Sequence, residues 1–118
     1  MIEAGSIVVL HLVNPTEKFW GVLSDLNEVG ATFRSLNVES FEDWVAAAVG
    51  GGTGAIGLST MFVPLLRVER IFLDEQVGEV ESYRQRFERR VGIPLGVYLG
   101  MEAAAEESVE RTDEESAS

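Results

Sequence analysis

Few residues in this chain combine type and spacing in a way that could support chemistry. The segment Gly52–Gly57 reads GTGAIG, which has the G-x-G-x-x-G spacing that lets a dinucleotide pyrophosphate approach a helix N-terminus. That site needs a strand before the glycines and a helix after them, whereas here a helical pattern precedes them and a β pattern containing Pro64 follows. Leu58 stands where a phosphate-binding loop carries its lysine. We interpret residues 50–57 as a surface loop, and binding of a nucleotide or small molecule is the alternative.

Groups suited to acid–base, nucleophilic or metal chemistry are also scarce. His11 is the single histidine, it lies in an apolar run, and no partner for a proton relay is near it in sequence. The chain has no cysteine, which excludes thiol nucleophiles, zinc–thiolate sites and disulfides. The main acidic groups lack the spacing of a calcium loop; they are Glu42-Asp43, Asp74-Glu75 and Glu79–Glu81. We therefore predict a protein without enzymatic activity, metal or cofactor.

One basic cluster follows these acidic groups, and it consists of Arg84, Arg86, Arg89 and Arg90. The same segment also carries glutamates, so one interpretation is an exposed face of ion pairs that contributes little to stability. The other interpretation is an anion-binding patch for an acidic partner or for the chain's own acidic C-terminal segment. In that case deletion of residues 102–118 should uncover binding of anions.

The net charge argues against polyanionic partners. It is −11, from 20 acidic and 9 basic residues, and more than half of it comes from residues 102–118, which hold seven acids and one arginine. Proteins that neutralise nucleic-acid phosphates normally present a basic face, so RNA is a disfavoured partner. No apolar run approaches the ~18 residues of a membrane span, and the first residues lack the pattern of a signal peptide. We expect a cytoplasmic protein that does not bind membranes.

The elements that would position these residues are mainly β-strands. Short apolar or alternating runs between turn residues predict strands over Ser6–Val13, Lys18–Asp25, Ala31–Val38, Thr60–Leu66 and Arg67–Leu73. The last two ranges are either two strands or one long strand bent around Pro64, which favours an edge or a bulge. Gly21, between aromatic and aliphatic neighbours, indicates a bend or a close approach of two backbones.

Helical periodicity appears in two places. Apolar residues recur at helical spacing over Phe41–Val49, and the glycines that follow end that helix. After Glu79 a second apolar stripe predicts a helix that stops at Gly92 and Pro94; its members are Val80, Tyr83, Phe87 and Val91. Ile93–Met101 is apolar enough to be ordered, as a second short helix from Pro94.

Together these elements predict a mainly β fold: a small, strongly bent five-stranded barrel with a short inserted helix and a C-terminal helix. We divide the chain into a barrel at residues 1–75 with a glycine-rich insertion at 39–59, a C-terminal helical segment at 76–101, and an acidic tail at 102–118. The tail has too few apolar residues to offset the entropy of ordering, so we expect it to be disordered.

Residues 7–73 resemble the Sm-like family of small bent barrels, which includes the LSm proteins and bacterial Hfq. The first family motif is matched by Gly21, Leu23, Leu26 and Asn27, with Asn27 in place of the acid. The second resembles Val63–Ile71, which ends in Val68-Glu69-Arg70-Ile71. The resemblance implies a five-stranded barrel, and members of the family usually assemble into rings.

The positions at which this family binds RNA differ in this chain. Its base-pocket asparagine is replaced by Ala31, and the polar or basic pair of its second motif by Leu65 and Leu66. These side chains offer neither the hydrogen bonds nor the charge that recognition of single-stranded RNA uses.

We therefore expect a non-enzymatic interaction or assembly module that resembles Sm-like proteins and forms homo-oligomers, or that binds a protein partner as SH3-like barrels do. The candidate partner or subunit surface is formed by apolar residues that would remain exposed if the core does not use them: Trp20, Trp44, Leu65 and Leu66. An RNA-binding regulator of the Hfq type and a nucleotide or small-molecule binder that uses the glycine-rich loop are the alternative functions.

Overall fold

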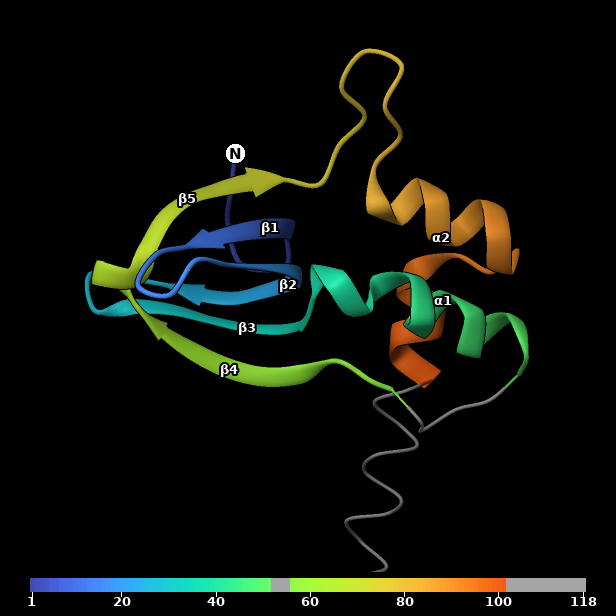
Figure 1. The fold of residues 1–118 in the computed structure, drawn as a ribbon, viewed down its shortest axis with the longest axis horizontal. Helices are drawn as coiled ribbons and strands as arrows, with labels where there is room; N and C mark the ends of the chain where they lie inside the picture. The colour runs from blue at the N-terminus through green and yellow to red at the C-terminus, as the bar shows by residue number, and fades with distance from the viewer. Residues whose placement is uncertain (52–55, 102–118) are drawn as a thin grey trace, which may run out of the picture.

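The structure is a computed structural model that describes residues 1–51 and 56–101. Five strands form one antiparallel sheet in the order β4-β3-β2-β1-β5 (Figure 1). Their bounds are β1 Ile7–Leu12, β2 Glu17–Leu26, β3 Gly30–Asn37, β4 Ser59–Pro64 and β5 Val68–Leu73. The prediction of a mainly β protein with five strands is confirmed. The predicted barrel is not confirmed, because the bent sheet stays open: its two edges, β4 and β5, do not pair with each other.

Gly21 is required by the close approach of β2 and β3. It pairs with Ser35 across the two strands, and a Cβ atom built on it would lie 2.0 Å from the carbonyl oxygen of Arg34. No side chain fits at that distance, so only glycine allows the two backbones to come together here. The sequence-based prediction of a bend or a close backbone approach at Gly21 is therefore confirmed as a close approach.

The chain between β4 and β5 forms a single turn of 3-10 helix, η2 (Leu65–Arg67). Proline has no N–H to donate to a strand ladder, and β4 ends at Pro64. Of the two predicted arrangements, the structure shows two separate strands and not one long bent strand. The predicted strand ends at Leu66 and Arg67 are wrong, since these residues belong to η2.

Two helices match the predicted periodicity. α1 spans Phe41–Val49, as predicted, and follows a short 3-10 turn, η1 (Val38–Ser40). α2 spans Tyr83–Val91 and begins at a capping box in which the Ser82 side chain accepts from the Gln85 N–H. It ends at Gly92, whose φ of 80° is the left-handed conformation that glycine favours. Residues 95–101 are helical as well, which confirms the second short helix after Pro94.

The two faces of the sheet pack into two separate apolar clusters. Alternate residues of β1 divide between them, because successive side chains of a strand point to opposite faces. The sheet cluster lies on the inner face of the bent sheet and contains Val8, Leu10, Leu12, Leu23, Ala31, Phe33 and Val63. The helical cluster lies on the opposite face and contains Trp20, Leu36, Phe41, Trp44, Val45, Ala48, Leu58, Phe87, Leu95 and Tyr98. The helices cover only one end of the sheet (Figure 1), so the rest of this face is open to solvent.

Among the described residues, none of the helices has the length and apolar character needed to cross a membrane.

Candidate functional site

The two tryptophans expected on a partner surface are part of the core, so that prediction is wrong for them. Trp20 and Trp44 are both fully buried, with ring centroids 5.5 Å apart. Trp44 also stacks on Phe87 of α2, with centroids 4.9 Å apart and an interplanar angle of 25°. Large aromatic side chains contribute most when buried, and the packing of α1 and α2 against the sheet buries both indoles. They hold the helical layer on the sheet and are closed to any partner.

Leu65 and Leu66 are exposed, as expected, and they lie within a larger apolar patch. Leu66 is 94% exposed and Leu65 is 44% exposed. The Leu65 N–H donates to the Val29 carbonyl oxygen at 2.9 Å, which joins η2 to the β2–β3 turn. A Cβ atom on Gly30 would lie 2.8 Å from the Phe62 ring, so this ring covers the start of β3. We call the resulting surface the end patch; it consists of Leu26, Val29, Phe62, Leu65 and Leu66.

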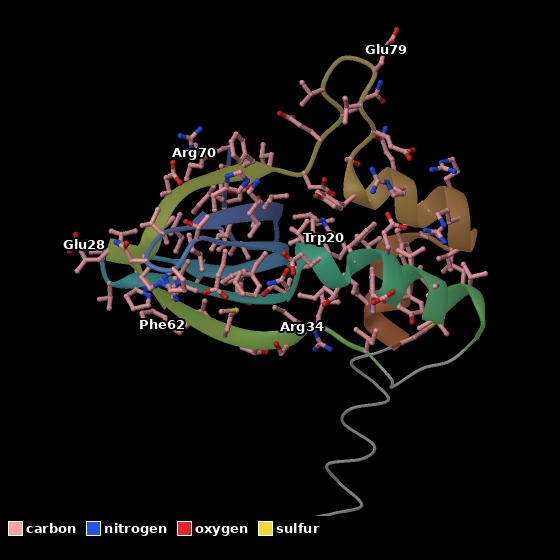
Figure 2. The ribbon with its side chains drawn as sticks, in the orientation of Figure 1. Trp20, Glu28, Arg34, Phe62, Arg70 and Glu79 are labelled. Carbon is pink, nitrogen blue, oxygen red and sulfur yellow. The ribbon has the colours of Figure 1, made fainter. Side chains whose placement is uncertain are left out.

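The end patch lies at the end of the sheet that is farthest from the helices. Figure 2 shows Phe62 and Glu28 at this end and Trp20 toward the helical layer. Only Leu65 and Leu66 are identified by sequence reasoning. The sequence does not indicate that Leu26, Val29 and Phe62 are exposed, because their exposure depends on which part of the bent sheet the helices leave uncovered.

Strand β4 runs from the end patch along a free edge of the sheet. Because Leu65 donates to Val29, alternate residues of β4 such as Val63 and Met61 direct their backbone groups toward β3. Thr60 and Phe62 therefore direct theirs away from the sheet. The sequence of β4, STMFVP, contains no charged residue, although edge strands are commonly protected by charge. The edge is thus open to pairing with another strand.

The arginine cluster of α2 is bound to acidic side chains of the same protein. The Arg86 Nη1 lies 2.9 Å from the Glu42 Oε1, and Arg90 also pairs with Glu42. The Arg89 Nη2 lies 2.6 Å from the Glu81 Oε1. The remaining arginine, Arg84, lies 3.5 Å from Glu88. This geometry agrees with the interpretation as an exposed face of ion pairs. The hydrogen bond from Arg89 is the main cause that lowers the pKa of Glu81.

His11 is a half-buried strand residue whose closest partners are basic or aromatic. It lies directly opposite Lys18 on β2 and Arg70 on β5, and its ring contacts Phe72 with centroids 4.9 Å apart. Burial is the main cause that lowers its pKa, followed by the charges of Lys18 and Arg70; the charge of Glu69 acts in the opposite direction. No acid–base relay such as a His–carboxylate pair involves His11 among the described residues.

Comparison with protein-family models, curated proteins and solved structures gives no match for this chain.

The remaining sequence-based candidates are placed as follows. Ala31, at the position of the family's base-pocket asparagine, is fully buried in the sheet cluster and is closed to a ligand. Residues 52–55 of the glycine-rich loop lie outside the described part of the chain, as does the acidic segment 102–118. Within residues 1–51 and 56–101, no group of three histidine, aspartate or glutamate side chains is placed to hold a metal ion.

Proposed function

We propose that this protein is a non-enzymatic assembly module of the Sm-like kind, which forms homo-oligomers by pairing the free edges of its sheet. In this arrangement β4 of one copy adds to β5 of the next. The observation that carries the proposal is the uncharged free edge of β4 beside the exposed end patch.

The order of the strands supports this mode of assembly. The two edges, β4 and β5, lie on opposite sides of one open sheet, so a contact between them is heterologous, with a different surface on each copy. Heterologous contacts repeat from copy to copy and produce a ring when the rotation closes. The bend of the sheet favours such closure, which agrees with the ring assembly that the resemblance to Sm-like proteins implies.

The chemistry of the two edges is also suitable for pairing. β4 offers backbone N–H and C=O groups at Thr60 and Phe62 with no charge to repel a strand. On β5 the Asp74 N–H donates to the Ile7 carbonyl oxygen, so Ile71 and Leu73 direct their backbone groups away from the sheet. The side chain of Phe72, between them on this edge strand, is exposed. Addition of a strand satisfies backbone hydrogen bonds along its whole length, while apolar side chains at alternate positions give specificity. Contact with a neighbouring copy would also cover part of the end patch.

The native mass of the full-length protein, measured by light scattering after size exclusion, tests the proposal. We expect a particle several times heavier than the 12.9 kDa chain. Thr60→Pro removes an outward N–H from the β4 edge without touching the β3–β4 ladder, and Leu66→Lys places a charge in the end patch. Both variants should fold, as judged by circular dichroism, and should be monomeric.

Val77→Lys is the matched control for Leu66→Lys. Val77 is 68% exposed in the connection between β5 and α2, so the same charge at this position should leave the assembly intact. A wild-type chain that remains monomeric at high micromolar concentration would overturn the proposal and would favour a monomeric adaptor that binds another protein. An assembly that survives both Thr60→Pro and Leu66→Lys would show that a different surface joins the copies.

A further inference from the structure

Three basic side chains form a row across the open face of the sheet. Lys18, His11 and Arg70 are direct neighbours on β2, β1 and β5. Because adjacent strands lie about 4.8 Å apart, the row spans roughly 10 Å. We call these three residues the cationic row. Phe72 borders the row: its ring contacts His11, and the Arg70 guanidinium carbon lies 5.9 Å from its centroid.

The positive charge of the row is poorly compensated. Like charges at directly opposite positions on neighbouring strands are unfavourable, and Lys18 makes no ion pair with any described residue. Arg70 pairs with the adjacent Glu69 at 3.1 Å, and the two side chains are 58% and 45% exposed. Such an exposed pair is weak. The lowered pKa of His11 has the same origin in part, since Lys18 and Arg70 disfavour a third positive charge between them.

The arginines of α2 differ from the row in this respect. Their guanidinium groups already pair with acidic side chains of the body, namely Glu42, Glu81 and Glu88. An acidic segment that bound there would have to displace these carboxylates. At the cationic row it would displace only the weak pair of Arg70 with Glu69. The row is therefore the better site for an acidic segment.

We propose that the acidic C-terminal segment of the same chain, residues 102–118, binds over the cationic row. This segment has seven acidic residues and one arginine, so its charge is complementary to the row. The inference does not require the assembly proposed above, although the two share β5: the row uses side chains on the open face, whereas the assembly uses the backbone groups of the β4 and β5 edges.

The position of the row makes this contact accessible to the segment. Residues 95–101 directly precede the acidic segment, and they belong to the helical cluster through Leu95 and Tyr98. Ile7 and Val9 of β1 pack against that cluster, and His11 is the next residue of β1 on the same face. An extended segment of 17 residues reaches about 55 Å, which exceeds the 44 Å longest dimension of the molecule. Figure 2 shows Arg70 on the part of the sheet that the helices do not cover.

The single histidine provides a direct test, because its pKa can be measured by NMR in the full-length protein without ambiguous assignment. We compare the wild-type protein with a neutralised variant, in which every glutamate of residues 102–118 is replaced by glutamine and Asp113 by asparagine. A carboxylate about 10 Å from His11 in water raises its pKa by roughly 0.3 units. We therefore expect the pKa of His11 to fall by at least about 0.3 units in the variant at low salt. The difference should disappear in ~1 M salt, where the screening length is about 3 Å.

Two controls make the result decisive. Glu69→Gln should lower the pKa of His11, since Glu69 raises it, and this shows that the measurement detects a nearby carboxylate. The double variant Glu28→Gln/Glu79→Gln removes two exposed acids, which Figure 2 shows at remote points of the molecule, and should leave that pKa nearly unchanged. An unchanged pKa in the neutralised variant, with a clear shift in Glu69→Gln, would overturn the proposal. A shift that grows with protein concentration would assign the contact to another copy and would also overturn it.

Discussion

The indole of Trp20 donates a hydrogen bond from Nε1 to the Asp74 carboxylate at 3.0 Å. The same carboxylate accepts from the backbone N–H groups of Tyr83 and Arg84 at 2.9 Å, which are the first two residues of α2. One side chain at the end of β5 thus satisfies a buried indole of the sheet and two free donors at a helix N-terminus. Asp74 connects the two layers of the fold although it is remote in sequence from Trp20.

Replacement of Asp74 by alanine should destabilise the protein. The change leaves the Trp20 N–H and two N–H groups of α2 without an acceptor, and the loss of a charged partner with a capping role costs roughly 2 kcal/mol. Urea denaturation of the variant measures this change. Glu75→Ala is the control: Glu75 is adjacent and exposed, so its removal should change the free energy of unfolding by less than about 0.5 kcal/mol. Equal effects of the two substitutions would contradict the bridging role of Asp74.

Trp44→Ala tests the assignment of the tryptophans to the core. Trp44 is fully buried between Trp20, Phe41, Phe87 and Tyr98, and truncation of a large aromatic side chain in a core costs about 3–5 kcal/mol. Leu66→Ala, at a position that is 94% exposed, should cost less than about 0.5 kcal/mol. Thermal unfolding of both variants gives the comparison. A stable Trp44→Ala protein would return Trp44 to the candidate surface residues.

Gly21→Ala should be among the most damaging small changes in the chain. The added Cβ would meet the carbonyl oxygen of Arg34 at 2.0 Å and the Cα of Ser35 at 2.6 Å, so β2 and β3 must separate; we expect a loss of at least about 2 kcal/mol.

Gly96→Ala is the matched control for this substitution. Gly96 lies in the helical residues 95–101, and a Cβ atom added to it would have no neighbour within 4 Å. Alanine in place of a helical glycine stabilises by about 0.5–1 kcal/mol. Calorimetric melting temperatures should therefore move in opposite directions for the two variants. A shift in the same direction would show that the close approach at Gly21 is absent in solution.

Local signals in the sequence account for the elements that were predicted correctly. The bounds of α1 follow from apolar spacing and from the glycines after Val49, and the end of α2 follows from Gly92, because each signal acts within one or two turns of chain. The close approach at Gly21 is likewise indicated by its neighbours. These features need no knowledge of which segments meet in the folded molecule.

The features that sequence reasoning missed depend on contacts between distant segments. Trp20 and Trp44 are buried because α1 lies on the sheet, and a hydrophobic pattern alone does not distinguish a core aromatic from a surface one. The edge position of β4 depends on the order of all five strands. The sequence alone does not predict the cationic row either, since Lys18, His11 and Arg70 become neighbours only through the pairing of β1 with β2 and β5.

The pKa of His11 should make stability depend on pH between neutral and mildly acidic conditions. Burial and the charges of Lys18 and Arg70 lower this pKa in the folded protein from the ordinary value of 6.5. The unfolded chain therefore binds a proton more readily than the folded one below about pH 6.5, and protonation favours unfolding. The stability that neutral His11 contributes to the folded protein is fully present above about pH 6.5. It is lost as the pH falls through the lower pKa of the folded state.

His11→Gln removes this titration while keeping a polar side chain at the same strand position. Between pH 7.5 and 5 the free energy of unfolding, measured in urea, should fall more steeply for the wild-type protein than for the variant. Lys18→Gln retains the histidine but removes one of the charges that disfavour its protonation, so its slope should lie between the other two. Parallel pH profiles for wild-type and His11→Gln would mean that His11 has the same pKa in the folded and unfolded chains.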